Sequence, residues 1–408
     1  HWERPREEIA MKTQTRVLAG LGAAGMLITI VAPAQAGTKW GGPQEVSSKL
    51  GRSIGVSDDG RVAAWIRTNK SDGSGPVRTS WYKSTKKGWL PSAPIPGTAM
   101  ITGLQLSTDG NFAFAEAPGT GYLLAQRTTQ NTWGAAQTIV TGAQLDYGQA
   151  SSDTSTIVWV DWAGATDYPV AVPGSVKAQT RKPDGTWNAP VEIGKINYDF
   201  YYGYYETDPI ALSADGSTLA WFDETYALKV STKQADGTWG APVLVKQYAS
   251  DPSVTTLRLS ANGSSLIWAQ AGEEGIVITS RAGTGWTPLG YVTTDETTRA
   301  DISPDGLTVA YGTDANQLIT RRWNGTAWGK PVVVGSASNP GIALKNKTLA
   351  WSSSVYSGST VRVSIYKKGK WQPTTKVTSA GQSPALNTSG TTLVWGSTSN
   401  KRIYSVKR

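Results

Sequence analysis

Two residue types with reactive side chains are almost absent from this sequence. It contains no cysteine, and its single histidine is His1. A chain without them has no thiol nucleophile, no imidazole base and no zinc site made from the usual ligands. A metal ion could bind only through oxygen ligands, as calcium does, and the sequence indicates no cofactor. Because no disulfide can form, a large hydrophobic core has to hold the fold.

Long apolar runs are also scarce, and the one that exists, at residues 17–31, lies close to the start. A short basic region precedes it, and residues 34–36, Ala-Gln-Ala, form a small-residue cleavage site. We therefore expect residues 11–36 to be a secretory signal peptide that is cleaved between Ala36 and Gly37. The run is shorter than the ~20 residues that span a bilayer, so we expect no transmembrane segment in the mature chain.

The residues before Met11 show no targeting pattern of their own. Glu7 and Glu8 could be encoded by GAGGAG, a purine-rich ribosome-binding sequence, so we interpret residues 1–10 as a leader from a mis-assigned start. The predicted mature protein comprises residues 37–408 and is secreted. The whole chain carries a formal net charge of +9, and no continuous basic groove with interleaved aromatic residues indicates binding to nucleic acid.

A two-part pattern repeats along residues 37–408. Each unit has a Ser-x-Asp-Gly turn before a strand that ends in an aromatic residue, and about 20 to 30 residues later a Trp-x-x-Pro segment. The clearest copy occupies residues 210–242. Apolar residues alternate with period two between closely spaced turn residues, which predicts short antiparallel strands rather than helices.

The aromatic positions of the repeat form two series. The first is Trp65, Phe114, Trp159, Trp221, Trp268, Tyr311, Trp351 and Trp395, and the second is Trp40, Trp89, Trp133, Trp187, Trp239, Trp286, Trp328 and Trp371. Their spacing of about 46 residues is typical of one four-stranded propeller blade. We predict an all-β fold, a single β-propeller of four-stranded antiparallel blades, eight in number with seven as the alternative. Most of these aromatic side chains are expected to pack between blades.

The two series are out of phase with each other. The repeat begins with an outer strand, at residues 39–46, and ends after a third strand, at residues 402–406. Pairing of the first strand with the last removes two exposed sheet edges that invite aggregation. We therefore predict that the N-terminal strand completes the C-terminal blade and closes the ring.

The turn sequences resemble those of known propeller families. Residues 302–311, Ile-Ser-Pro-Asp-Gly-Leu-Thr-Val-Ala-Tyr, resemble the repeat of secreted bacterial TolB-type, WD-repeat-like propellers. Residues 182–187 and 234–239 are similar to degenerate Asp-boxes of the sialidase family, in which the box is a structural turn. Both likenesses imply architecture and leave the ligand open.

Candidate binding residues lie in three irregular loops of the third and fourth units. In an up-and-down blade the first and third connections share one face, and the second connection shares the other with the link to the next blade. The long insertions all fall on this second face, where function usually resides. The candidates are Asp161, Trp162, Tyr168, Tyr198, Tyr201, Tyr202, Tyr204, Tyr205, Glu206, Asp208, Asp223 and Glu224.

These residues predict an acidic, tyrosine-rich patch, because no Lys or Arg lies between Lys195 and Lys229. Flat aromatic faces beside carboxylates suit sugar rings and cationic groups. The alternative is that the tyrosines pack on each other and close the mouth of a central channel. Basic residues gather elsewhere, at Lys86 and Lys87 and at residues 367–370, where they could meet anionic polymers or lipid headgroups or simply maintain solubility.

We expect a secreted, monomeric, non-catalytic propeller that binds an extracellular glycan, a cell-envelope component or a protein partner through these loops. No catalytic residue and no metal site is assigned. Two alternatives remain open. One is a carboxylate-dependent glycoside hydrolase or lyase on the same face, since two carboxylates ~5 to 9 Å apart suffice for glycoside cleavage. The other is a protein-interaction scaffold without a small ligand.

Overall fold

The computed structural model describes residues 40–68, 74–142, 144–162, 173–196, 209–250, 254–270, 275–283, 285–287, 290–295, 297–354 and 359–408. Two units separate in the chain, His1–Gly37 and Thr38–Arg408, and the described residues belong to the second. The regular elements within these ranges are all β-strands. The described ranges contain no helix long and apolar enough to span a membrane.

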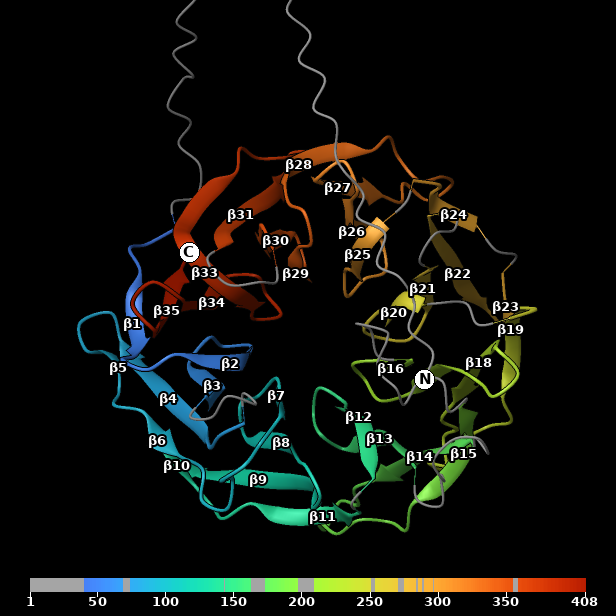
Figure 1. Ribbon diagram of the computed structural model, residues 1–408, viewed down its shortest axis with the longest axis horizontal. Coiled ribbons are helices and arrows are strands. Elements are labelled where there is room, and N and C mark those ends of the chain that lie inside the picture. The colour runs from blue at the N-terminus through green and yellow to red at the C-terminus, as the bar shows by residue number, and fades with distance from the viewer. Residues whose placement is uncertain are drawn as a thin grey trace, which may run out of the picture. The chain divides into compact units, whose positions relative to one another are not determined.

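Six sheets of four or five antiparallel strands follow one another in chain order around a ring (Figure 1). The first contains β2 (Gly51–Val56), β3 (Val62–Arg67), β4 (Val77–Ser84), β5 (Gly88–Trp89) and β6 (Ala93–Pro94). The second contains β7 (Gly103–Leu106), β8 (Phe112–Ala117), β9 (Gly121–Thr129), β10 (Thr132–Trp133) and β11 (Gln137–Thr141). The third contains β12 (Leu145–Ala150), β13 (Thr156–Asp161), β14 (Gly174–Thr180) and β15 (Val191–Ile196).

The fourth sheet contains β16 (Ile210–Leu212), β17 (Thr218–Phe222), β18 (Ala227–Thr232) and β19 (Val243–Gln247). The fifth contains β20 (Val254–Leu259), β21 (Ser265–Gln270), β22 (Ile276–Ala282), β23 (Gly285–Trp286) and β24 (Gly290–Thr293). The sixth contains β25 (Thr297–Ile302), β26 (Thr308–Thr313), β27 (Gln317–Arg322) and β28 (Val332–Ser336). In each of the six, the first strand lies toward the centre of the ring.

The remaining strands form one continuous sheet of eight strands. It contains β29 (Gly341–Lys345), β30 (Thr348–Ser352), β31 (Ser359–Lys367), β32 (Lys370–Trp371), β33 (Thr375–Leu386), β34 (Thr392–Ser397), β35 (Arg402–Lys407) and β1 (Gln44–Ser47). The prediction of eight, or alternatively seven, equivalent blades is therefore wrong. The fold has six separate blades of four or five strands, and a larger sheet completes the ring.

The cause of the difference is the 12-residue strand β33. Its first half pairs with β31, and from Gly381 onward its second half pairs with β34. Gly381 stands at this change of partner, where a Cβ atom would approach the Val361 side chain to 2.5 Å. Because no turn interrupts the chain here, two units of the sequence repeat share one strand instead of forming separate sheets.

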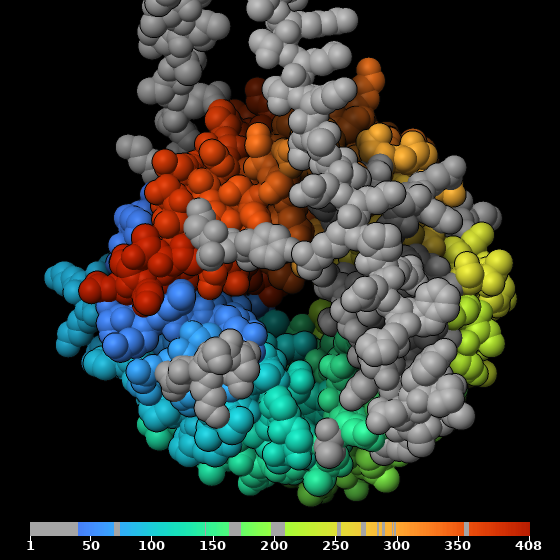
Figure 2. Space-filling model, viewed as in Figure 1, coloured from blue at the N-terminus to red at the C-terminus, as the bar shows by residue number. Residues whose placement is uncertain are grey.

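The predicted ring closure is confirmed, because β1 pairs antiparallel with β35. Gln44 lies opposite Ser405 and Glu45 opposite Tyr404, and Val46 is buried. The Glu45 carboxylate accepts a hydrogen bond from Arg402 at 2.5 Å. Figure 2 shows the consequence on one face, where the red C-terminal residues adjoin the blue N-terminal ones.

The aromatic residues of the first series, from Trp65 to Trp395, are core residues, as predicted. Trp65, Trp268 and Trp351 have no exposed surface, and the fully buried side chains also include Trp159, Trp221, Trp395 and Tyr311. Burial of a large aromatic side chain stabilises a fold by several kcal/mol, roughly 3 to 5 by the cost of truncation. These positions therefore hold neighbouring blades together and are not available to a ligand.

The Ser-x-Asp-Gly segment forms the turn between the first two strands of a blade. In the fourth sheet, Ser213 donates a hydrogen bond to Asp215 at 2.6 Å and accepts one from the Thr218 N–H at 2.9 Å. Gly216 has a φ of 69°, in the left-handed region that glycine adopts at little cost. Ser213 is completely buried and Asp215 is exposed, so the serine fixes the turn from inside and the carboxylate faces solvent.

Backbone hydrogen bonds join these turns from blade to blade. Asp58 N–H donates to Thr108 O at 2.6 Å, Thr108 N–H donates to Ser152 O at 2.8 Å, and Ser152 N–H donates to Ala214 O at 2.7 Å. At the closure, the Asn387 amide donates to Asp58 O at 2.7 Å. We call the end of the ring with these turns the turn face, and the opposite end the loop face.

Candidate functional site

A central channel of about 1060 Å³ passes between the inner strands. Polar side chains in its wall mostly join neighbouring blades. Gln149 donates to Ile210 O and accepts from Leu212 N–H, both at 2.9 Å, and Asp301 accepts from Leu344 N–H at 3.0 Å. The wall is therefore part of the scaffold as much as a surface for ligands.

Eight of the twelve predicted binding residues lie outside the described residues. They are Tyr168, Tyr198, Tyr201, Tyr202, Tyr204, Tyr205, Glu206 and Asp208. The other four, Asp161, Trp162, Asp223 and Glu224, are described, and all stand at the ends of β13 and β17 on the loop face. Their contacts distinguish structural residues from those that a ligand could reach.

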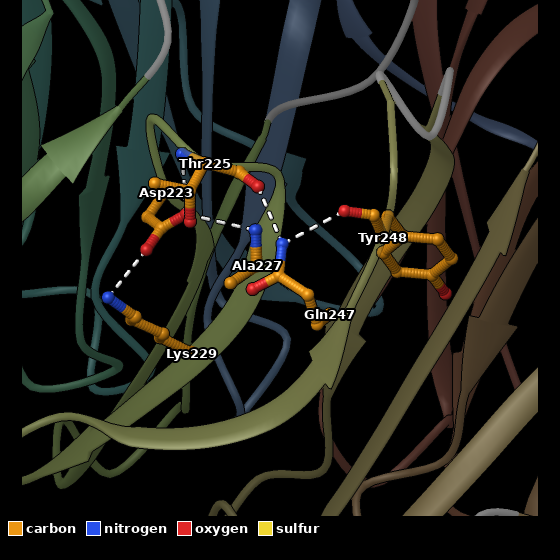
Figure 3. A network of polar contacts seen from close by, with 6 residues as sticks. All are labelled: Asp223, Thr225, Ala227, Lys229, Gln247 and Tyr248. Carbon is orange, nitrogen blue, oxygen red and sulfur yellow. Dashed lines mark hydrogen bonds and ion pairs between the residues drawn. The ribbon is translucent and has the colours of Figure 1, made fainter.

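Asp223 is a structural residue of the turn after β17 (Figure 3). One carboxylate oxygen accepts hydrogen bonds from Thr225 N–H and its hydroxyl, both at 2.8 Å, and from Ala227 N–H at 2.9 Å. The other oxygen forms an ion pair with Lys229 at 2.5 Å. Burial acts to raise the pKa of Asp223, but these hydrogen bonds outweigh it and leave the pKa below its ordinary value.

Asp161 has the same kind of partner in the preceding blade. Its carboxylate lies 2.7 Å from the Lys177 ammonium. Lys177 stands opposite Trp159 on the neighbouring strand, as Lys229 stands opposite Trp221. The acidic patch was predicted because no Lys or Arg lies between Lys195 and Lys229. Lys177 lies before that interval and pairs with Asp161, and Lys229 at its end pairs with Asp223. Both carboxylates are therefore neutralised by lysines from the adjacent strand.

Trp162 and Glu224 differ in their access to solvent. Trp162 is buried with 1% of its surface exposed, and a Cβ atom at Gly174 would come within 2.6 Å of its ring. It therefore packs in the core and offers no flat face to a sugar. Glu224 is exposed at the tip of the turn, where a ligand could reach its carboxylate.

A polar network around Tyr248 continues from the same turn into the fifth sheet. Gln247 donates hydrogen bonds to Thr225 O at 2.7 Å and Tyr248 O at 2.9 Å (Figure 3). The Tyr248 hydroxyl accepts a hydrogen bond from the Trp268 indole at 2.7 Å. The sequence pattern did not predict this network. The usable signal was Tyr248, an aromatic residue directly after the outer strand β19.

A second cavity of about 400 Å³ opens at the loop-face ends of β7, β8 and β12. Its wall includes two carboxylates, Glu116 and Asp146, and two aromatic rings, Phe114 and Tyr147. Asp146 is next to Leu145, which pairs with the predicted residue Asp161 across the sheet. The sequence pattern does not predict this cavity, because its residues come from three sheets.

Backbone bulges shape the wall of this cavity. Tyr147 has a φ of 55° and Ser53 a φ of 48°, both unusual for residues with a side chain. The pairing of β12 with β13 shifts register between Asp146 and Gln149. Bulges often redirect side chains next to binding sites, and here they accompany the carboxylate and ring at residues 146 and 147.

The described ranges hold no group of three or more histidine or acidic residues that could bind a metal ion. The described side chains on the loop face include carboxylates and aromatic rings. Such groups recognise ligands that donate hydrogen bonds and present flat or cationic surfaces.

The architecture defines this chain as a β-propeller, and solved structures agree. It is similar to the C-terminal WD40 domain of Sif2, with a TM-score of 0.57 and 12% identity over 90% of this chain and 98% of that one. It is also similar to the Dos1 propeller, with a TM-score of 0.56 and 12% identity over 90% of this chain and 95% of that one. At this identity the likeness shows the fold alone.

The sequence matches no protein-family model and no curated protein. The two solved propellers confirm the expected likeness to WD-repeat propellers at the level of the fold. The closer resemblances, to TolB-type repeats and to sialidase Asp-boxes, stay predictions.

Proposed function

We propose that this protein is a secreted, non-catalytic propeller that binds an extracellular glycan or cell-envelope component on its loop face. The observation that carries the proposal is the 400 Å³ cavity with Glu116, Asp146 and Tyr147 in its wall. Carboxylates accept hydrogen bonds from sugar hydroxyls, and an aromatic ring such as that of Tyr147 stacks on the apolar face of a sugar. The cavity adjoins β13, the strand that leads into the first of the predicted binding loops.

The state of the other loop-face carboxylates supports binding rather than catalysis. Asp161 and Asp223 are held in ion pairs at 2.7 Å and 2.5 Å. The hydrogen bonds that lower the pKa of Asp223 also keep it ionised at neutral pH, so it cannot serve as the proton donor that glycoside cleavage needs. A rigid ring of this kind is consistent with a non-catalytic interaction scaffold.

Location outside the cell rests on the sequence. The proposed signal peptide at residues 11–36 indicates export. The resemblance of residues 302–311 to secreted TolB-type propellers supports the same placement.

A glycan array tests the proposal with four proteins: the mature chain, a Glu116→Gln, Asp146→Asn variant, a Tyr201→Ala, Tyr204→Ala variant, and an Asp314→Asn control. Asp314 is an exposed carboxylate on the loop face of another blade. We expect a glycan that binds the mature chain and the control but binds the cavity variant at least about 10-fold more weakly, the loss of roughly 1.4 kcal/mol.

Product release from the bound glycan decides between binding and catalysis. Turnover by the mature chain that the cavity variant lacks would establish a glycoside hydrolase or lyase instead. Binding to no glycan would leave the interaction scaffold, with a protein as the partner. Equal loss in the control would show that the cavity is not the site.

A further inference from the structure

Charge is distributed very unevenly along the sequence. Residues 315–408 contain 14 Lys or Arg and no Asp or Glu, so all 30 acidic residues lie in residues 1–314. Within the described ranges, carboxylates form ion pairs with two of these fourteen cations: Asp305 with Arg322 at 4.0 Å and Glu45 with Arg402 at 2.5 Å. The last quarter of the sequence therefore carries a positive charge that the fold does not neutralise.

Two hairpins present exposed lysines, and we call them the lysine hairpins. The β4–β5 hairpin carries Lys86 and Lys87, and the β31–β32 hairpin carries Lys367, Lys368 and Lys370. Each is braced by an edge-to-face pair of rings with centroids 5.5 Å apart, Tyr82 with Trp89 and Tyr366 with Trp371. The shared geometry gives both lysine clusters a rigid base.

Both lysine hairpins lie on the turn face. Tyr82 N–H donates to Arg61 O beside the β2–β3 turn at 2.7 Å, and Tyr366 N–H donates to Lys347 O beside the β29–β30 turn at 2.7 Å. Lys407, at the end of β35, places its ammonium 3.6 Å from the centre of the Tyr82 ring. The closing strand thus adds a further cation beside the first hairpin.

The same hairpin position in the third and fourth blades carries an aspartate. At the tips of β14–β15 and β18–β19 stand Asp184 and Asp236, each accepting two hydrogen bonds from the threonine two residues later. By contrast, Lys368 has a φ of 52°, a conformation that Gly or Asn adopts more readily. The turn therefore does not require lysine, and adjacent like charges at its tip oppose folding.

We propose that the part of the turn face formed by the two lysine hairpins and Lys407 docks the protein on an anionic phospholipid membrane. Neighbouring hairpin tips at one end of a ring can meet a flat surface together, and these lysines line neither the central channel nor the 400 Å³ cavity. Lysine is a compact point charge that is attracted to anionic leaflets. The described residues of the two hairpins include no exposed large hydrophobic side chain, so docking is electrostatic and reversible.

Vesicle sedimentation tests the docking with the mature chain, residues 37–408. The probes are vesicles of phosphatidylcholine with about 30 mol% phosphatidylglycerol, vesicles of phosphatidylcholine alone, and soluble polyphosphate as competitor. We expect binding to the anionic vesicles only, with an affinity that falls steeply with added salt.

Two charge-matched variants make the test specific. Lys367, Lys368 and Lys370 are changed to Glu in one. In the control, three exposed lysines at the loop-face ends of strands, Lys49, Lys246 and Lys401, are changed to Glu. We expect the hairpin variant to bind anionic vesicles on the order of 100-fold more weakly, and the control to lose less than about 10-fold. Circular dichroism establishes that both variants are folded.

Three results would overturn the proposal. Equal weakening in the two variants would mean that net charge alone drives binding. Binding to polyphosphate in preference to anionic vesicles would assign the face to a soluble polyanion. Failure of the mature chain to bind anionic vesicles at low salt would show that it has no membrane-docking face.

Discussion

The two sides of the ring use the same turns but differ in almost everything attached to them. On the side of β12–β19, the hairpin tips carry Asp184 and Asp236, and the connections at residues 162–173 and 197–209 are long. On the side of β29–β35 and β1–β6, the hairpin tips carry lysines, and one unbroken sheet closes the ring. The repeated turns and strands thus form the scaffold. The charged hairpin tips and the long connections, which differ from blade to blade, provide the groups that could bind a ligand.

Removal of β1 should have the largest effect, because it breaks the closing side. A chain that starts at Ser48 loses the pairing of Gln44, Glu45 and Ser47 with β35 and the buried Val46. Burial of one valine and a few hydrogen bonds together contribute roughly 4 kcal/mol. Urea unfolding should show at least this loss, and size-exclusion chromatography should show association through the exposed β35 edge. A stable monomer would contradict the closure.

Asp223→Asn should have the next largest effect and tests the other side. The change leaves Lys229 without its buried partner, which costs about 3 kcal/mol, whereas Asp161→Asn removes a more exposed pair worth about 0.5 to 1 kcal/mol. Chemical denaturation of both variants measures the difference. Equal losses would mean that burial does not set the strength of the two pairs.

The pH dependence of Asp223 follows from its lowered pKa. Because the folded-state pKa lies below the unfolded one, the unfolded state binds more protons between the two values, and stability rises with pH there. The contribution is complete above the unfolded pKa of ~3.9 and is lost as the pH falls through the folded one. Asp223→Asn should therefore flatten the acid limb of the stability curve.

The ring closure and the core aromatics were predictable from the sequence, and the sheet and site details were not. The burial of Trp221 and Trp395 follows from a repeat in which apolar residues alternate with period two. The phase difference between the two aromatic series leads directly to the pairing of β1 with β35. The continuity of β33 depends on the absence of a turn near Gly381, which the repeat itself does not report. The partner of Asp161 comes from a neighbouring strand, and the cavity at Glu116 and Asp146 joins three sheets, so neither contact is local in sequence.

Gly216→Ala tests the turn chemistry that both sides share. Its φ of 69° disfavours alanine, and the added Cβ atom would lie 2.8 Å from the Thr156 hydroxyl and 2.9 Å from the Ser151 Cβ atom. We expect a loss of about 2 to 3 kcal/mol from strain and crowding together. Gly237→Ala is the matched control, since its φ is 86° but nothing lies within 4 Å, and it should lose about 1 kcal/mol. Equal losses would show that contact between blades at this glycine is unimportant.

The smallest expected effect is the contribution of Lys407, on the closing side of the ring, to the change of stability with pH at alkaline pH. Burial lowers its pKa to about 8, and nearby Asp59 opposes the shift. Between this pH and the unfolded pKa of ~10.4 the unfolded state binds more protons, so stability rises with pH. The side chain is partly solvated, so the gain is less than about 1 kcal/mol. Lys407→Met should remove this rise, and an unchanged pH profile would show that the ammonium is not desolvated.

The separation of scaffold from binding surface is tested most directly by measuring unfolding and ligand binding on two variants of the mature chain. Gly216→Ala changes the repeated turn, and Tyr201→Ala, Tyr204→Ala changes the predicted binding loop; the ligand is the strongest hit of the glycan array. We predict that the turn variant loses stability yet keeps its affinity per folded molecule, whereas the loop variant keeps its stability and loses affinity. The reverse pattern, with affinity lost in the turn variant and stability lost in the loop variant, would contradict the account.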